Sequence, residues 1–240
     1  MIEIAPFDYF EESAKDIIGH LRPLFAKGAC YVREDTKIGV RGINIWDVPW
    51  VYTVPEKEPY CILSRQVVFP HYGWIPSRCH KCWKVVVRPR ALKELFALYE
   101  LQKQLDLPSK VGLEERPQIH GIYGGYFYND TLDKARQCKV VVERRVAADI
   151  SPDIPIFIQR GCSEYEDKFP DTTAWKISRE QKDIETHLAK WLVLETKKAD
   201  QSELVIRNVK RKWIERACEV GHEYRQFSGG RPLYKTKMIY

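Results

Sequence analysis

The segment from residue 84 to 160 alternates between two hydrophobic patterns, and this alternation limits the fold more than any other feature. Residues 84–88 hold three consecutive valines, typical of a buried strand, whereas 91–105 spaces leucines and aromatics as a helix does. The following segments are strands at 110–114 and 119–128, a helix capped by Thr131 and ending near 148, and a strand at 154–159. The order β-α-β-β-α-β predicts a ferredoxin-like centre. A small parallel α/β sheet is the alternative, because 119–128 is rich in glycine and aromatics.

The flanking segments predict an α+β protein around this centre. Before it we expect a helix at 8–27 and short strands at 29–32, 42–46, 48–53 and 61–69. After it we expect an acidic loop at 163–171, two helices that begin after Ser178 and Ser202, and a basic arm from Gly229 to Tyr240. We therefore divide the chain into an N-terminal extension (1–83), the ferredoxin-like core (84–162) and a C-terminal part (163–240), forming one compact unit.

Composition and cysteine count limit the class of protein. A hydrophobic fraction of 44% in 240 residues is enough for a real core. Seven cysteines is an odd number without the spacing of a secreted disulfide scaffold, so we expect reduced thiols and a cytoplasmic protein. No apolar run reaches the roughly 18 residues that span a bilayer, so no membrane contact is expected. The oligomeric state is not indicated.

A Cys-x-x-Cys pair, Cys79 and Cys82, predicts a metal site just before the first strand of the centre. In a ferredoxin-like sheet of order 4-1-3-2 the last strand ends beside the start of the first, which brings Cys162 to this pair. Cys61 supplies a fourth ligand, with His71 or His80 as alternatives. Four such ligands suit structural zinc. An iron–sulfur cluster, or ordinary buried thiols, are the competing interpretations.

Clustered cations predict contact with a polyanion. The net charge is +6, and residues 197–240 alone hold eleven cations against five acids. Phosphate binding requires such clusters, and aromatic side chains stack on unpaired bases. The predicted nucleic-acid-binding residues are Arg78, Lys81, Trp83, Lys84, Arg88, Arg90, Arg207, Lys210 and Arg211. An acidic partner protein is the alternative, because charge alone does not separate the two.

An enzyme is the competing class of function. Glu164 and Glu166 closely follow Cys162, and His120 lies near two tyrosines of the third strand. A metal-bound water with a carboxylate base suits hydrolysis, and an activated thiol suits group transfer. No motif of fixed spacing supports either reaction, so we identify no catalytic residues. The sequence favours a zinc-stabilised protein that binds nucleic acid through a basic surface.

Overall fold

The computed structural model describes residues 19, 21–22, 24–26, 28–35, 37–40, 48–53, 58–194 and 201–233. The chain forms two compact units, each assembled from separate segments. Unit 1 comprises Met1–Asn44, Glu56–His80 and Lys168–Lys198, and unit 2 comprises Ile45–Pro55, Lys81–Asp167 and Ala199–Tyr240. Both units contain helices and strands, which confirms the predicted α+β class.

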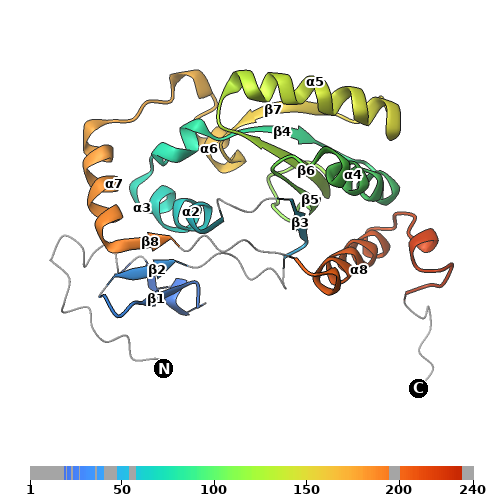
Figure 1. Cartoon of the computed structure of the whole chain (residues 1–240), viewed down its shortest axis with the longest axis horizontal. Coiled ribbons are helices and arrows are strands. Elements are labelled where there is room, and N and C mark those ends of the chain that lie inside the picture. The colour runs from blue at the N-terminus through green and yellow to red at the C-terminus, as the bar shows by residue number, and fades with distance from the viewer. Residues whose placement is uncertain are drawn as a thin grey trace. The chain divides into compact units, whose positions relative to one another are not determined.

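Unit 2 is built on a five-stranded sheet of order β3-β5-β6-β4-β7, in which every neighbouring pair is antiparallel. The strands are β3 (Trp50–Tyr52), β4 (Trp83–Val87), β5 (Ser109–Leu113), β6 (Tyr123–Asn129) and β7 (Ile156–Arg160). Helix α4 (Leu92–Leu105) connects β4 to β5, and α5 (Leu132–Asp149) connects β6 to β7. Both helices pack against the sheet (Figure 1).

The core of unit 2 lies between this sheet and its helices. Val85 and Val87 alternate along β4 and belong to the same buried cluster as the leucines of α4. A third helix, α8 (Glu203–Glu219), contacts α4, β3 and β5. Its Trp213 is 0% exposed, and the indole Nε1 donates a hydrogen bond to Pro49 O at 2.8 Å. This contact fixes which face of α8 is buried.

Gly112 allows the close approach of the segment before β3. A Cβ atom at this position would lie 2.1 Å from Pro49 O and 2.9 Å from Trp50 Cα, both of which are backbone atoms. Trp50 is also the register partner of Gly112. A side chain at residue 112 would therefore push β3 away from β5.

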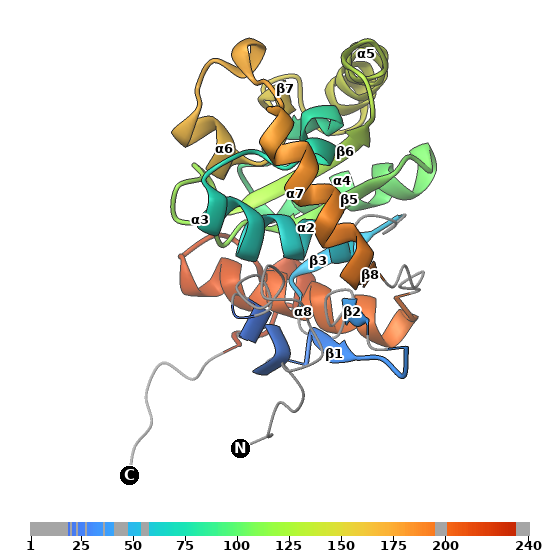
Figure 2. The same ribbon diagram turned by 90° about the vertical axis from the view of Figure 1, so that its left-hand side faces the viewer.

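Unit 1 has a smaller sheet of order β1-β2-β8, formed by β1 (Cys30–Val32), β2 (Ile38–Val40) and β8 (Leu192–Leu194). Strands β1 and β2 are antiparallel, whereas β2 and β8 are parallel. The helical elements are α2 (Glu58–Leu63), a π-helix (Ser64–Val68), α3 (Phe69–Tyr72), 3₁₀ turns at Ser77–Lys81 and Thr172–Ala174, and α7 (Arg179–Trp191). Helix α7 leads directly into β8 (Figure 2).

The helices and strands predicted between 84 and 160 are all observed, with ends that differ by a few residues. The predicted caps are also present, since the side chains of Thr131, Ser178 and Ser202 accept hydrogen bonds from the backbone of the first helical turn. Residues 19–26 are helical where described, as predicted. Residues 8–18 and the predicted strand at 42–46 lie outside the described part of the chain.

The prediction of a strand at 61–69 is wrong, because α2 and the π-helix occupy this segment. Its valines favour a strand, but Ser64 and Val68 are buried four residues apart, which is a helical spacing. The prediction of a loop at 163–171 is also wrong over its first part, where α6 (Ser163–Lys168) forms. Tyr165 is buried and holds one face of this short helix against the protein.

Candidate functional site

The face of the unit 2 sheet opposite α4 and α5 carries a group of charged side chains. Lys84 and Arg88 alternate with the valines of the helix-covered face of β4, and Val86, between them, pairs with Tyr126 of β6. Glu114 follows the last residue of β5 on the same face. We call this surface the polar face of the sheet.

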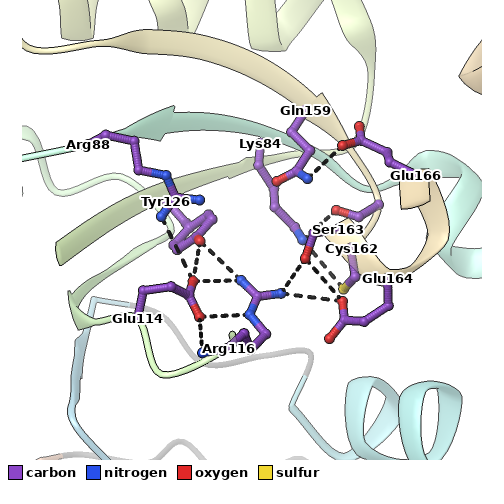
Figure 3. Close-up of polar contacts among 11 residues, drawn as sticks. Lys84, Arg88, Glu114, Arg116, Tyr126, Gln159, Cys162, Ser163, Glu164 and Glu166 are labelled. Carbon is purple, nitrogen blue, oxygen red and sulfur yellow. Dashed lines mark hydrogen bonds and ion pairs between the residues drawn. The ribbon is translucent and has the colours of Figure 1, made fainter. Parts of the chain in front are cut away.

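Glu114 is the centre of a hydrogen-bond network on the polar face (Figure 3). Its side chain is 2% exposed, and Arg116 binds both carboxylate oxygens, with Nε–Oε1 and Nη2–Oε2 distances of 2.7 Å each. The hydroxyl of Tyr126 donates to Oε2 at 2.5 Å, and Arg88 Nη1 lies 3.8 Å from the same oxygen. This two-point guanidinium contact is the strong form of an ion pair.

The network keeps Glu114 ionised. Burial alone would raise the pKa of this carboxyl, but the hydrogen bonds from Arg116 and Tyr126 outweigh burial and lower the pKa to about 2. The carboxylate is therefore charged throughout the neutral range and has donors for both oxygens. A buried group satisfied in this way stabilises the fold and is poorly suited to accept a proton from a substrate.

Arg116 also connects the polar face to α6. Its Nη1 donates to Ser163 Oγ at 3.0 Å and lies 3.3 Å from Glu164 Oε2. Glu166 accepts a hydrogen bond from Gln159 Nε2 at 2.8 Å. Both glutamates considered as catalytic bases are thus bound to neighbouring side chains, which weakens the carboxylate-base form of the enzyme hypothesis.

Cys162 lies at the turn between β7 and α6, beside the buried ammonium group of Lys84. Gly161 makes this turn possible, because its φ of 64° is in the left-handed region. Lys84 is 6% exposed, and its Nζ donates to Gly161 O at 2.5 Å and lies 3.5 Å from Cys162 Sγ. The sulfur therefore has a cationic neighbour, which would oppose binding of a metal cation at the same atom.

The four cysteines predicted to bind metal divide between the two units. Cys61 in α2 and Cys79 in the 3₁₀ turn belong to unit 1, whereas Cys82 and Cys162 belong to unit 2. Within unit 2 the predicted proximity is present, since Gly161 N donates to Cys82 O at 2.7 Å. Among the described residues, no three His, Cys, Asp or Glu side chains are grouped as a metal site. Zinc binding stays a prediction.

The two histidines considered as alternative ligands have ring contacts in unit 1. His71 lies in α3 against Tyr72, with ring centroids 4.3 Å apart. His80 is buried, its Nε2 lies 3.2 Å from Ile75 O, and its ring meets Trp175 edge-on.

The predicted basic residues around β4 lie in different local surroundings. Lys84 and Arg88 belong to the polar face, whereas Lys81 and Arg90 are exposed beyond opposite ends of the strand. Trp83 is half-buried, and the guanidinium of Arg160 lies 5.1 Å from its ring centroid. Arg78 is exposed in unit 1, where it stacks on Tyr60 at 4.9 Å.

The predicted basic residues of α8 have different environments. Arg207 and Arg211 are exposed, and Arg211 pairs with Glu215 at 2.8 Å. Lys210 instead lies 4.0 Å from the ring centroid of Tyr99, and burial lowers its pKa. Lys210 is therefore part of the packing between α8 and α4.

Sequence patterns missed the network around Glu114. Glu114 and Arg116 lie two residues apart just after β5, but Tyr126 comes from the middle of β6, so the strand register is needed to bring it to them. The alternation of side chains along the strands could have indicated part of it, because pairing β4 with β6 puts Tyr126 on the same face of the sheet as Lys84.

None of the helices in the described parts of the chain is long and apolar enough to cross a membrane. Comparisons with protein families, with curated proteins and with solved structures found no match to this chain. The candidate sites therefore rest on their geometry alone.

Proposed function

We propose that the protein binds nucleic acid through the solvent-facing side of α8. One observation carries this proposal: the opposite side of the helix is locked in the core of unit 2. Val205, Val209 and Trp213 are each at most 1% exposed, so the rotation of the helix is fixed and Arg207 and Arg211 point to solvent one turn apart. Exposed guanidinium groups held at a fixed spacing suit contact with successive phosphates.

The existing ion pairs on this side of α8 do not prevent phosphate binding. Arg211 is 77% exposed in its pair with Glu215, and Arg216 pairs with Glu219 at 3.0 Å. Exposed pairs of this kind contribute at most about 1 kcal/mol. A phosphate group can therefore replace the glutamate as the partner of each arginine.

The test compares two double variants with equal loss of charge. Arg207→Gln with Arg211→Gln removes the proposed contacts, whereas Lys134→Gln with Arg136→Gln removes two exposed charges from α5 of the same unit. Binding to single- and double-stranded oligonucleotides is measured by fluorescence anisotropy over a range of salt concentrations. We expect the α8 variant to weaken binding and to lower the slope of log K against log salt by about 0.7–0.9 per lost phosphate contact.

Equal effects of the two double variants would show a non-specific charge effect and overturn the α8 assignment. Absence of binding by the unaltered protein at low salt would overturn nucleic-acid binding as a whole. In that case an acidic partner protein becomes the better candidate for this surface.

A second candidate function is thiol chemistry at Cys162, which the contact between Lys84 Nζ and the sulfur supports. An ammonium group beside a cysteine is a common environment for a nucleophilic thiol. The comparison thiol is Cys138, whose pKa is raised by burial. We expect iodoacetamide to modify Cys162 faster than Cys138, and Lys84→Met to remove this advantage. Equal rates in the unaltered protein would contradict the idea.

The finer fold assignment is also a proposal: we assign residues 83–160 to the ferredoxin-like topology. The order β5-β6-β4-β7 supports it, with α4 and α5 in the two crossover connections and β3 added beside β5. An experimental structure of the whole chain tests this assignment. A parallel pairing of β4 with either neighbour would contradict it.

A further inference from the structure

Unit 1 contains a cavity of about 730 Å³ that no part of the proposed function uses. Its walls come from α2, the π-helix, the turn after Ile75, α7 and β8. Leu63, Val68 and Leu188 are buried apolar residues of the lining, and Leu192 and Leu194 extend it along β8. This volume lies within the range of about 300–1,000 Å³ that is usual for small-molecule sites.

Polar groups of the lining include two cations and one acid. Arg78 is exposed and stacks on Tyr60, with its guanidinium carbon 4.9 Å from the ring centroid, and Lys182 is exposed on α7. Among the described residues of the lining, Glu185 is the acid. These described residues carry an excess of positive charge, which would attract an anion.

Glu185 already has donors within unit 1. Its Oε1 accepts hydrogen bonds from Ser77 N at 2.9 Å and from Gln181 Nε2 at 2.8 Å. Gln181 also donates to Ile75 O at 2.7 Å, which ties α7 to the turn before Ser77. These contacts hold the acid in a structural role, so the two cations of the lining remain as its recognition groups.

Tyr60 adds a hydroxyl to the lining. A tyrosine hydroxyl can donate a hydrogen bond to an anion. Its oxygen also accepts a hydrogen bond from Arg78 N at 3.4 Å, which links it to the cationic residue.

We propose that this cavity binds a small amphipathic anion, with its apolar body against the leucines and its carboxylate or similar head group beside Arg78 and Lys182. A neutral apolar ligand would leave the two cations unused, and a highly charged one would leave the leucines exposed to water. An apolar cavity wall with cations beside it favours a ligand that has both an apolar body and an anionic head group.

The test uses the full chain with dodecanoate and its uncharged counterpart dodecanol as probes, measured by calorimetry below their aggregation concentrations. We expect the unaltered protein to bind dodecanoate more tightly than dodecanol. Arg78→Gln together with Lys182→Gln should weaken dodecanoate binding by about 10-fold or more and leave dodecanol binding unchanged, since a hydrogen bond to a charged group contributes about 1.5–3 kcal/mol. The matched control is Arg179→Gln with Lys190→Gln, which removes two charges of α7 outside the lining.

A third variant tests the apolar chamber. Ala189 lines the cavity but is exposed, so Ala189→Trp should block both probes without loss of the fold, which thermal unfolding checks. Equal weakening by the lining and control variants, or no binding of either probe to the unaltered protein, would overturn the proposal. Oligonucleotide binding by the same variants separates this result from the α8 proposal, because Ala189→Trp should not change it.

Discussion

Replacing Glu114 by glutamine tests the electrostatic logic of the polar face. The change keeps the size of the side chain but removes the charge that Arg116 and Tyr126 stabilise. The carboxyl has a pKa of about 2 in the folded protein and 4.5 without its partners. At about 1.36 kcal/mol per pKa unit, this difference corresponds to roughly 3 kcal/mol of stability at neutral pH. Breaking a buried ion pair by removing one partner costs a similar amount.

The pH dependence gives the sharper test. Because folding lowers the pKa, the stabilisation is fully present above about pH 4.5 and is lost as pH falls towards 2. We expect the free energy of unfolding of the unaltered protein to fall through this window relative to that of Glu114→Gln. Urea unfolding followed by tryptophan fluorescence measures both proteins at pH 7, 4 and 3.

The control for this experiment is Glu115→Gln, a neighbouring and exposed position that should change stability little. The reasoning would be refuted by a Glu114→Gln protein that unfolds within about 0.5 kcal/mol of the unaltered one at pH 7. A difference between the two proteins that stays constant from pH 7 to pH 3 would also refute it, because the network would then not be linked to the carboxyl charge.

Three further predictions concern the backbone, a helix cap and the metal. Gly112→Ala should lower the free energy of unfolding by about 1–3 kcal/mol, because the new Cβ meets backbone atoms of the segment before β3. Gly19→Ala, which is helical and has nothing within 4 Å of its new Cβ, should instead raise it by about 0.5–1 kcal/mol in the same urea titration. Thr131→Ala should cost about 1 kcal/mol through the lost cap of α5, measured by thermal unfolding. Elemental analysis should find one zinc per chain that Cys79→Ser or Cys82→Ser removes; a metal-free protein with an unchanged melting temperature would contradict this.

The hydrophobic periodicity predicted the centre of unit 2 correctly because the secondary structure that the pattern favours is also the one that buries these residues in the fold. The valines of β4 are buried where the sequence places them, and the leucine stripe of α4 packs on the same face. Unit 1 was less predictable, because β2 pairs with the distant strand β8 and its central glycine carries a weak strand signal. In the π-helix, which buries Ser64 and Val68 on one side, the packing outweighs the strand preference of the valines.

For the candidate sites, too, the sequence predicted some contacts and missed others that depend on residues far apart in the chain. The sequence predicted that Cys162 comes near the start of β4, and the hydrogen bond between Gly161 and Cys82 agrees with that reasoning. It did not predict that Lys84, expected to contact phosphate, would instead lie beside the sulfur of Cys162. Alternation along β4 was sufficient to place Lys84 on one face, but the turn geometry at Gly161 was needed to bring the thiol there.

The parallel pairing of β2 with β8 has a consequence for synthesis on the ribosome. Gly39 finds its partner Val193 only after the whole of β4 to β7 has emerged, so the sheet of unit 1 cannot be completed until unit 2 has had time to assemble its central strands. During this interval β1 and β2 can pair with each other, but the edge of β2 that later pairs with β8 stays exposed. Nascent chains stalled before residue 192 should therefore leave β1 and β2 open to cleavage by protease, whereas chains long enough to expose β8 should protect them.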